Sequence, residues 1–412
     1  MNWSNHFASR AQHMRASEIR ELLKLLDQGD IISFAGGIPD ARLFPIDDIL
    51  EASTNILSDP SRSTMALQYS VSEGYAPLRK WLATNMGQRG VACSQDNILI
   101  TNGSQQALDF LGKLFISSGD LILTSSPTYL GALQAFNAYE PVYGLLPQKR
   151  EESKALCARA PKFGYVMPDF QNPTGTSLTL NDREKLLDLA AEIDMPLIED
   201  NAYECLRYDG EALPSLLALD ILRKGSIEKS QVIYCGTFSK SIVPALRVGW
   251  IVAPKPVIEK LVLINQASGL HVSSFNQMIM HEVAAKIIDA HTSKVREVYK
   301  KRRDAMLRAL AREMPDDVSW TSPSGGMFIW LTLPATIDTA VLLQEAIEKA
   351  RVAFVPGAAF YPDRSGGHTL RLSFSLAEPD QIDEGIRRLA GLIAAKTASH
   401  EMPEAVQFIN KM

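Results

Sequence analysis

The segment QVIYCGTFSKSIVPALRVGWIVA, residues 231–253, contains two short apolar runs separated by a loop that carries Lys240. Similar apolar runs precede it in the chain: NILIT (97–101), LILTS (121–125), FGYVMP (163–168) and MPLIED (195–200). Helical stretches such as residues 104–115 and 180–193 lie between these runs. Uniformly apolar strands that alternate with amphipathic helices are typical of a parallel sheet covered on both faces. The predicted fold class is therefore α/β.

The chain beyond about residue 275 has a different pattern. Residues 294–314 are strongly helical, and GGMFIWLTL (325–333) and HTLRLSFS (368–375) have the character of strands. This order of elements predicts a smaller α+β domain.

The N-terminal residues are expected to complete this second domain. Ser17 is predicted to cap a helix that ends at Gly29, and IISFAGGIPD (31–40) to form a short extended piece broken at its two glycines. The predicted division is a large domain of residues 46–290, with residues 1–45 and 291–412 as N-terminal arm and small domain.

Length and composition restrict the class of protein. A chain of 412 residues favours two domains that share a cleft, and the net charge of −5 argues against a nucleic-acid surface. No apolar run approaches the roughly 20 residues of a membrane helix. Neither zinc ligation nor a disulfide framework is expected, because the cysteines are widely spread: Cys93, Cys157, Cys205 and Cys235. These features predict a cytoplasmic protein, and the acid-poor N-terminus with Arg10 and Arg15 leaves an organelle-targeting peptide as the alternative.

Lys240 is the centre of the predicted chemistry. It follows the apolar run of residues 231–235, with hydroxyls on Thr237 and Ser239 beside it and Arg247 seven positions later. A lysine that forms a Schiff base must lose its proton, which desolvation and neighbouring cations assist. Hydroxyls and an arginine are groups that hold a phosphate. The alternative is a surface lysine in a serine-rich loop.

Two other segments place polar groups at the ends of apolar strands. In TNGSQQALDF (101–110), Ser104 and Gln105 begin a helix whose N–H groups can face an anion, unless Ser104 is merely a helix cap. In PLIEDNAY (196–203), Asp200 ends a strand at the edge where parallel sheets bind ligands. A carboxylate there can keep a pyridine nitrogen protonated, and a solvated pair with Glu199 is the alternative.

Three single residues complete the candidate site. Asn172, in the turn DFQNPTG, is able to donate a hydrogen bond to a ring oxygen, and Tyr129 is able to stack on a ring. Arg371 lies inside the apolar strand LRLSFS and needs an anion. A bidentate clamp on a carboxylate would supply one, and an internal salt bridge is the competing interpretation.

These pieces, taken in order, resemble the motifs of fold-type-I pyridoxal-phosphate (PLP) aminotransferases of class I and II. The matching segments are GSQQAL, QNPTG, EDNAY, FSK with the later arginine, and LRLSFS, so the resemblance covers nearly the whole chain. Further segments look most like the kynurenine/2-aminoadipate aminotransferases and their bacterial multisubstrate relatives: SEIREL, SFAGGIPD, GLHVSSFNQ, GGMFIW and VPGAAFY. The family implies a mostly parallel sheet of the seven-stranded type with helices on both faces, plus a small α+β domain.

The resemblance implies pyridoxal 5'-phosphate as cofactor and a role for each motif residue. Lys240 is implied to form the Schiff base and to move a proton as base and acid. Asp200 is implied to pair with the pyridinium nitrogen, Asn172 and Tyr203 to bind the phenolate oxygen, and Tyr129 to stack on the ring. The implied phosphate ligands are Ser104, Gln105, Thr237, Ser239 and Arg247.

The family pattern also implies substrate contacts and an assembly. Tyr69 is implied to reach the site of a neighbouring subunit, which makes a homodimer the minimal active unit. Arg371 is implied to clamp the substrate α-carboxylate, with Gly37, Asn172 and Tyr69 close by. Arg20 is implied to contact the distal carboxylate of an acidic substrate, and an ordinary helix arginine is the alternative.

The implied reaction moves the α-amino group of an L-amino acid (2-aminoadipate, aromatic or branched aliphatic) to a 2-oxo acid such as 2-oxoglutarate by a ping-pong mechanism. The alternatives are a PLP-dependent lyase or decarboxylase on the same scaffold and an aminotransferase-like regulatory protein. Neither a metal nor a nucleic-acid or membrane partner is expected.

Overall fold

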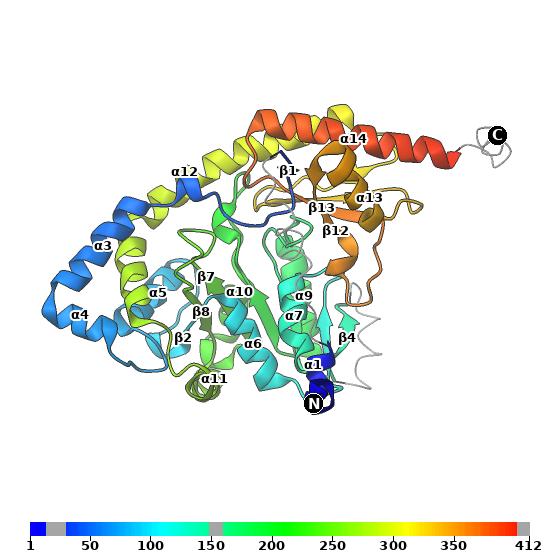
Figure 1. Ribbon diagram of the computed structural model, residues 1–412. Helices are drawn as coiled ribbons and strands as arrows, with labels where there is room; N and C mark the ends of the chain where they lie inside the picture. The colour runs from blue at the N-terminus through cyan, green and yellow to red at the C-terminus, as the bar shows by residue number, and fades with distance from the viewer. Residues whose placement is uncertain (14–29, 148–159, 402–412) are drawn as a thin grey trace.

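The computed structural model describes residues 1–13, 30–147 and 160–401, whose arrangement Figure 1 shows. A seven-stranded sheet lies at the centre, with the strand order β2-β8-β7-β6-β5-β3-β4. Strand β8 is antiparallel to both of its neighbours, and the other neighbouring pairs are parallel. The predicted α/β fold with a mostly parallel sheet is confirmed. The helix predicted after Ser17 lies outside the described residues, as do Arg15, Arg20 and Cys157.

The central strands are short and largely buried. Their bounds are Ile98–Thr101 (β2), Leu121–Thr124 (β3), Val142–Leu145 (β4), Gly164–Val166 (β5), Leu197–Asp200 (β6), Val232–Thr237 (β7) and Gly249–Val252 (β8). Apart from β4, all of their residues are buried, and for this reason each strand stands in the sequence as an apolar run. The edge strand β4 is partly exposed, and the apolar-run pattern does not predict it.

Helices cover both faces of this sheet. One face packs against α6 (Ser104–Phe115), α7 (Leu130–Asn137) and α11 (Lys255–Ser268). The other packs against α5 (Ala76–Gln88), α9 (Leu180–Glu192) and α10 (Leu216–Lys224). Successive strand residues enter opposite cores, because side chains of a strand alternate between its faces: Leu99 lies in the first core, and Ile98 and Ile100 lie in the second. The predicted helices 104–115 and 180–193 are α6 and α9.

The C-terminal part forms a second, antiparallel sheet in the order β12-β13-β10-β9. Its strands are β9 (Ser319–Trp320), β10 (Phe328–Thr332), β12 (Val355–Pro356) and β13 (Thr369–Ser373), and its helices are α13 (Thr339–Glu345) and α14 (Pro379–Glu401). Strand β1 (Ile32–Ser33) pairs in parallel with β11 (Val352–Ala353). Residues near the N-terminus therefore join the C-terminal part of the chain.

Helix α12 (Ser274–Glu313) is a single helix of 40 residues that runs from the central sheet to the small one (Figure 1). It contacts α3 (Ile46–Ser58), α4 (Pro60–Leu67) and α14. The predicted domain boundary between residues 290 and 291 falls inside this helix, and the division into two domains remains a prediction. The short helix α1 (Ser9–His13) lies close to the N-terminus of the chain.

The carboxyl ends of β2, β6 and β7 meet at one edge of the central sheet, since these strands run in the same direction. The loops that leave this edge carry Ser104, Tyr203 and Lys240. Parallel sheets bind ligands at this edge. Within the part of the chain that the structure describes, no helix is long and apolar enough to cross a membrane.

Candidate active site

Lys240 lies in the loop after β7 and is half-buried. Its Nζ donates a hydrogen bond to the Gly37 carbonyl oxygen at 2.9 Å and lies 5.9 Å from the centre of the Tyr203 ring. Burial lowers the pKa of Lys240 to about 8, with further lowering by the charges of Arg371 and Arg247. The amine therefore loses its proton near neutral pH, as a Schiff-base lysine must.

Asp200 is the last residue of β6, and 1% of it is exposed. Its Oδ2 accepts a hydrogen bond from the Tyr165 hydroxyl at 2.7 Å, whereas Oδ1 is buried without a partner among the described residues. Burial raises the pKa of Asp200 to about 6, against the opposing hydrogen bond from Tyr165. A buried carboxylate oxygen of this kind needs a donor.

Polar groups of three segments meet where α6 begins. The Arg247 guanidinium donates to the Ser239 hydroxyl at 3.4 Å and to the Asn102 carbonyl oxygen at 3.2 Å. Thr237 donates to the Ser239 hydroxyl at 2.9 Å. A guanidinium, two hydroxyls and the N-terminus of α6 thus lie together, and these are groups that bind a phosphate.

Gly103 allows this approach of Arg247 to α6. It caps α6 with φ 77°, and a Cβ at this position would collide with the Arg247 guanidinium. Gln105, the second residue of α6, uses its side-chain amide to donate to the Gly131 carbonyl oxygen at 2.7 Å. The backbone N–H groups of Ser104 and Gln105 are among the first of the helix, which have no acceptor within it.

Arg371 lies on β13 and is 1% exposed. Its guanidinium donates to Asn172 Oδ1 at 2.8 Å and to the Ala35 carbonyl oxygen at 3.0 Å, and it lies 4.2 Å from the centre of the Phe328 ring. Burial lowers the pKa of Arg371 to about 10. No carboxylate forms an ion pair with it in the described part of the chain, and its Nε has no partner there. The competing interpretation is an internal salt bridge, and Arg371 forms none with the described residues.

Of the remaining predicted residues, Gly37 and Tyr203 contact Lys240, and Asn172 contacts Arg371. Tyr203 and Asn172 are buried, and burial raises the pKa of Tyr203, so that its hydroxyl stays protonated. Tyr129 is half-buried and stands directly before α7. Gly37 lies beside Arg371 and Phe328, and a Cβ there would approach the Phe328 ring to 2.9 Å.

One predicted residue that the structure describes, Tyr69, is not brought to this site. Tyr69 is 79% exposed, with its ring 6.0 Å from that of His271 in an edge-on arrangement. Arg20 lies outside the described residues.

Tyr165 and Phe328 belong to the site although the motifs do not include them. Tyr165 did leave a signal, because a hydroxyl inside the apolar strand FGYVMP needs a hydrogen-bond partner. Phe328 left none, since its contact with Arg371 depends on the pairing of β10 with β13.

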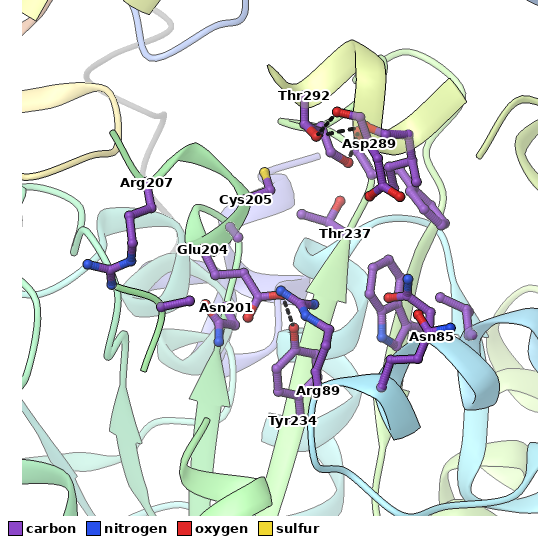
Figure 2. A pocket seen from close by; sticks show the side chains of 18 of the residues that line it. Asn85, Arg89, Asn201, Glu204, Cys205, Arg207, Tyr234, Thr237, Asp289 and Thr292 are labelled. Carbon is purple, nitrogen blue, oxygen red and sulfur yellow. Dashed lines mark hydrogen bonds and ion pairs between the residues drawn. The ribbon is translucent and has the colours of Figure 1, made fainter. Parts of the chain in front are cut away.

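A cavity of about 500 Å³, which Figure 2 shows, is lined in part by Phe238 and Ser241 of the segment that carries Lys240. Arg89, Glu204 and Tyr234 meet in its wall, where Glu204 pairs with Arg89 and accepts a hydrogen bond from the Tyr234 hydroxyl at 2.9 Å. Of the predicted site residues that the structure describes, Thr237 alone lines it. The cavity is therefore a neighbour of the candidate site.

The residues present fit PLP. Lys240 is suited to a Schiff base, Asp200 Oδ1 lacks the donor that a protonated ring nitrogen would provide, and Arg247 with its neighbours suits a phosphate. Among the described residues, no group of three or more His, Cys, Asp or Glu side chains is placed to hold a metal ion.

Known proteins are similar to this chain in sequence and in fold. Residues 30–389 match the family described as aminotransferase class I and II. The aromatic-amino-acid aminotransferase 1 of Thermococcus litoralis is 42% identical over 407 residues, which cover 95% of each chain. The α-aminoadipate aminotransferase of Thermus thermophilus, complexed with N-(5'-phosphopyridoxyl)-L-leucine, is 39% identical with a TM-score of 0.88, over 97% of this chain and 100% of that one. The Pyrococcus horikoshii kynurenine aminotransferase, complexed with PMP, is 42% identical with a TM-score of 0.89, over 96% and 98%.

These similarities confirm the predicted fold type I, the PLP cofactor and the resemblance to the aromatic, 2-aminoadipate and kynurenine group. They span nearly the whole chain and include its candidate active site. The chain therefore belongs to the class I and II aminotransferases and is a PLP-dependent transaminase.

Proposed function

We propose that this transaminase moves the α-amino group of an L-amino acid (2-aminoadipate, aromatic or branched aliphatic) to a 2-oxo acid such as 2-oxoglutarate by a ping-pong mechanism. The observation that carries the proposal is Arg371, a buried guanidinium without a carboxylate partner among the described residues. The α-carboxylate shared by amino acids and 2-oxo acids would satisfy it. The relatives named for aromatic amino acids, α-aminoadipate and kynurenine support these donor classes.

Bound PLP supplies an electron sink that stabilises negative charge on the substrate Cα. Lys240, whose pKa burial lowers to about 8, removes the Cα proton as a base and returns a proton as an acid. Asn172 Oδ1 accepts a hydrogen bond from Arg371, so the side-chain N–H groups of Asn172 would be the donors to the ring oxygen. The protonated Tyr203 hydroxyl would be a second donor, and Asp200 Oδ1 would accept from the ring nitrogen.

The other roles follow from the same resemblance. Tyr129 is proposed to stack on the ring, and Gly37 to border the substrate beside Arg371. Arg20 is proposed to recognise an acidic side chain. The proposed phosphate ligands are Ser104, Gln105, Thr237, Ser239 and Arg247.

We also propose a homodimer in which Tyr69 reaches the partner's site. Large apolar side chains between residues 46 and 71 support this, because they are exposed in the single chain: Ile46, Leu50, Leu57, Met65, Leu67 and Val71. A cytoplasmic location is supported by the free thiols of Cys93, Cys205 and Cys235.

Visible absorbance of the holoenzyme tests the proposed reaction. Single amino acids (2-aminoadipate, leucine, phenylalanine, kynurenine) are added in turn, followed by 2-oxoglutarate. We expect an amino donor to convert the PLP band to that of the pyridoxamine form, and 2-oxoglutarate to restore it. A band that 2-oxoglutarate does not restore would contradict the proposed acceptor, and one that none of these donors converts would contradict the proposed donor classes.

A further inference from the structure

The carboxylate of Asp200 is held through one oxygen. The Tyr165 hydroxyl donates to Oδ2 at 2.7 Å, and Oδ1 is buried without a partner in the described part of the chain. Tyr165 itself is fully buried. A carboxylate held at one oxygen and free at the other presents a single acceptor in a fixed direction.

The sheet fixes this contact. Tyr165 on β5 lies opposite Ile198 of the parallel neighbour β6, and Asp200 stands two residues further along β6. Residues two apart in a strand share a face, so Asp200 lies on the same face as Ile198. The Tyr165 ring packs edge-on against Phe136 of α7, with 5.6 Å between the ring centres. Both partners of the hydrogen bond thus belong to rigid, buried elements.

The Tyr165 hydroxyl can act here as a hydrogen-bond donor to Asp200. Burial raises the pKa of Tyr165 well above its ordinary value, so its hydroxyl remains a donor and cannot become an anion. Burial also raises the pKa of Asp200, and the hydrogen bond from Tyr165 opposes that rise. The hydroxyl therefore favours the charged form of Asp200.

We propose that Tyr165 is a positioning residue of this transaminase: by holding Oδ2 of Asp200, its hydroxyl leaves Oδ1 as the acceptor for the nitrogen of the PLP ring. The inference rests on the proposed pairing of Asp200 with that nitrogen. The competing interpretation is a core tyrosine whose hydroxyl merely finds a hydrogen-bond acceptor. The two differ in whether a change at Tyr165 reaches the cofactor.

The test compares the holoenzymes of the wild type, Tyr165→Phe and the control Tyr143→Phe. The phenylalanine keeps the ring that packs on Phe136, and thermal unfolding checks that each variant is folded. Tyr143 is a suitable control because its hydroxyl also makes a side-chain hydrogen bond, to Asn137 Oδ1 at 2.6 Å on the partly exposed edge strand β4, away from Asp200.

Two measurements report on the cofactor without turnover. The first is the dissociation constant of PLP, by equilibrium dialysis, which we expect to rise about 10-fold in Tyr165→Phe because a hydrogen bond to a charged group is lost. The second is the pH midpoint of the visible PLP band, which we expect to rise by about one pH unit. Without the Tyr165 hydroxyl, the charged form of Asp200 is less favoured, so the ring nitrogen holds its proton less well. A ring nitrogen without its positive charge repels a proton on the Schiff base less strongly, and the pKa of the Schiff base rises.

Asp200→Asn shows whether Tyr165 acts through Asp200. In this background we expect Tyr165→Phe to change neither measurement further, because the charged acceptor is already gone. Two results would overturn the proposal. One is an equal effect of Tyr165→Phe in the wild-type and Asp200→Asn backgrounds, and the other is a Tyr165→Phe enzyme that behaves like Tyr143→Phe in both measurements. A failed response of the wild type to amino donors would contradict the proposed function and leave this comparison intact.

Discussion

At the scale of single residues, the surroundings of Lys240 set its acidity. Burial and the charges of Arg371 and Arg247 lower its pKa to about 8, so the fraction of Lys240 in the neutral form increases as pH rises toward that value. We expect the rate of PLP attachment to the apoenzyme to increase up to about pH 8 and then to level off. In Arg371→Gln the midpoint should move upward, because one neighbouring cation is lost.

Stopped-flow absorbance across pH measures this midpoint. Arg312→Gln is the matched control, since this exposed arginine on α12 pairs with Glu313 and Asp383. A wild-type midpoint near 10, the ordinary range of lysine, would contradict the proposed effect of burial.

Arg371 sets a second expectation at this scale. A lysine there would keep the charge but lose the planar fork that matches a carboxylate. We expect kcat/KM for amino donors to fall about 10- to 100-fold in Arg371→Lys, while the dissociation constant of PLP stays unchanged. Steady-state kinetics and dialysis measure the two quantities, with exposed Arg308→Lys as control. Unchanged kcat/KM would remove Arg371 from substrate binding.

The sequence predicted most of the site because its chemistry is concentrated in local motifs. Lys240, Asp200 and Arg247 each stand in a short segment next to a buried strand, and strand ends gather at one edge of the sheet. The partners of Tyr165 and Phe328 could not be predicted, because they depend on pairing between strands that are distant in the sequence. The role proposed for Tyr69 involves a second chain, which no single-chain geometry contains.

At the scale of elements, one buried ion pair joins the segment after β1 to α12. Asp40 Oδ2 accepts from Arg302 at 2.8 Å, and the Asp40 N–H donates to the Tyr299 hydroxyl at 3.0 Å. Burial would raise the pKa of Asp40, but hydrogen bonds from Arg42 and Arg302 outweigh it and lower the pKa to about 2. The pair anchors the chain close to Gly37, whose carbonyl oxygen accepts from Lys240.

We expect Asp40→Asn to lower the free energy of unfolding by about 2 kcal/mol at neutral pH, because the buried Arg302 then keeps only the half-exposed Glu378 as a carboxylate partner. The folded pKa lies below the unfolded value of 3.8, so the contribution is present above about pH 4 and is lost as pH falls toward 2. The difference between wild type and variant should shrink over that window. Urea unfolding at several pH values measures it.

Glu384→Gln is the control for this experiment. Glu384 also pairs with arginines, Arg387 and Arg388, but on an exposed face of α14, where ion pairs contribute little to stability. An Asp40→Asn effect no larger than that of Glu384→Gln would contradict the anchoring role.

Elements differed in how well the sequence predicted them. Helix α6 has the predicted bounds of residues 104–115, since its apolar positions and its glycine cap are local signals. Strand β4 could not be predicted from the apolar-run pattern, because it is half-exposed at the sheet edge. The predicted boundary at residue 290 falls within α12. The sequence does not mark where this helix passes from the central sheet to the small one, because its periodicity has no break there.

At the scale of the whole molecule, the proposed homodimer makes a test of shared sites possible. Tyr69→Ala and Lys240→Ala are each expected to be nearly inactive alone. In a mixed dimer, one site would combine an intact Lys240 with the partner chain's intact Tyr69. After unfolding and refolding the two variants together, we expect activity to return to about one quarter of the wild type, since half of the dimers are mixed and each has one intact site.

Activity of the mixture decides the outcome, and light scattering checks that dimers have formed. The control mixes Lys240→Ala with Asp200→Ala, two residues that serve the site of their own chain. In this mixed dimer no site has both side chains, so no activity should return. Recovery in the control, or none in the Tyr69 mixture, would contradict the proposed sharing.

The contact between Gly37 and Lys240, and that between Asn172 and Arg371, have a consequence for biosynthesis. The ribosome makes Gly37 early and Arg371 late, and domains generally fold as units from the N-terminus onward. A nascent chain that has released β7 and β8 already displays Lys240 and Asp200, yet it still lacks the guanidinium that selects carboxylates. During this interval Lys240 also lacks one of the cations that lower its pKa, so the release of β13 completes both the acidity of Lys240 and the selectivity of the site for carboxylates.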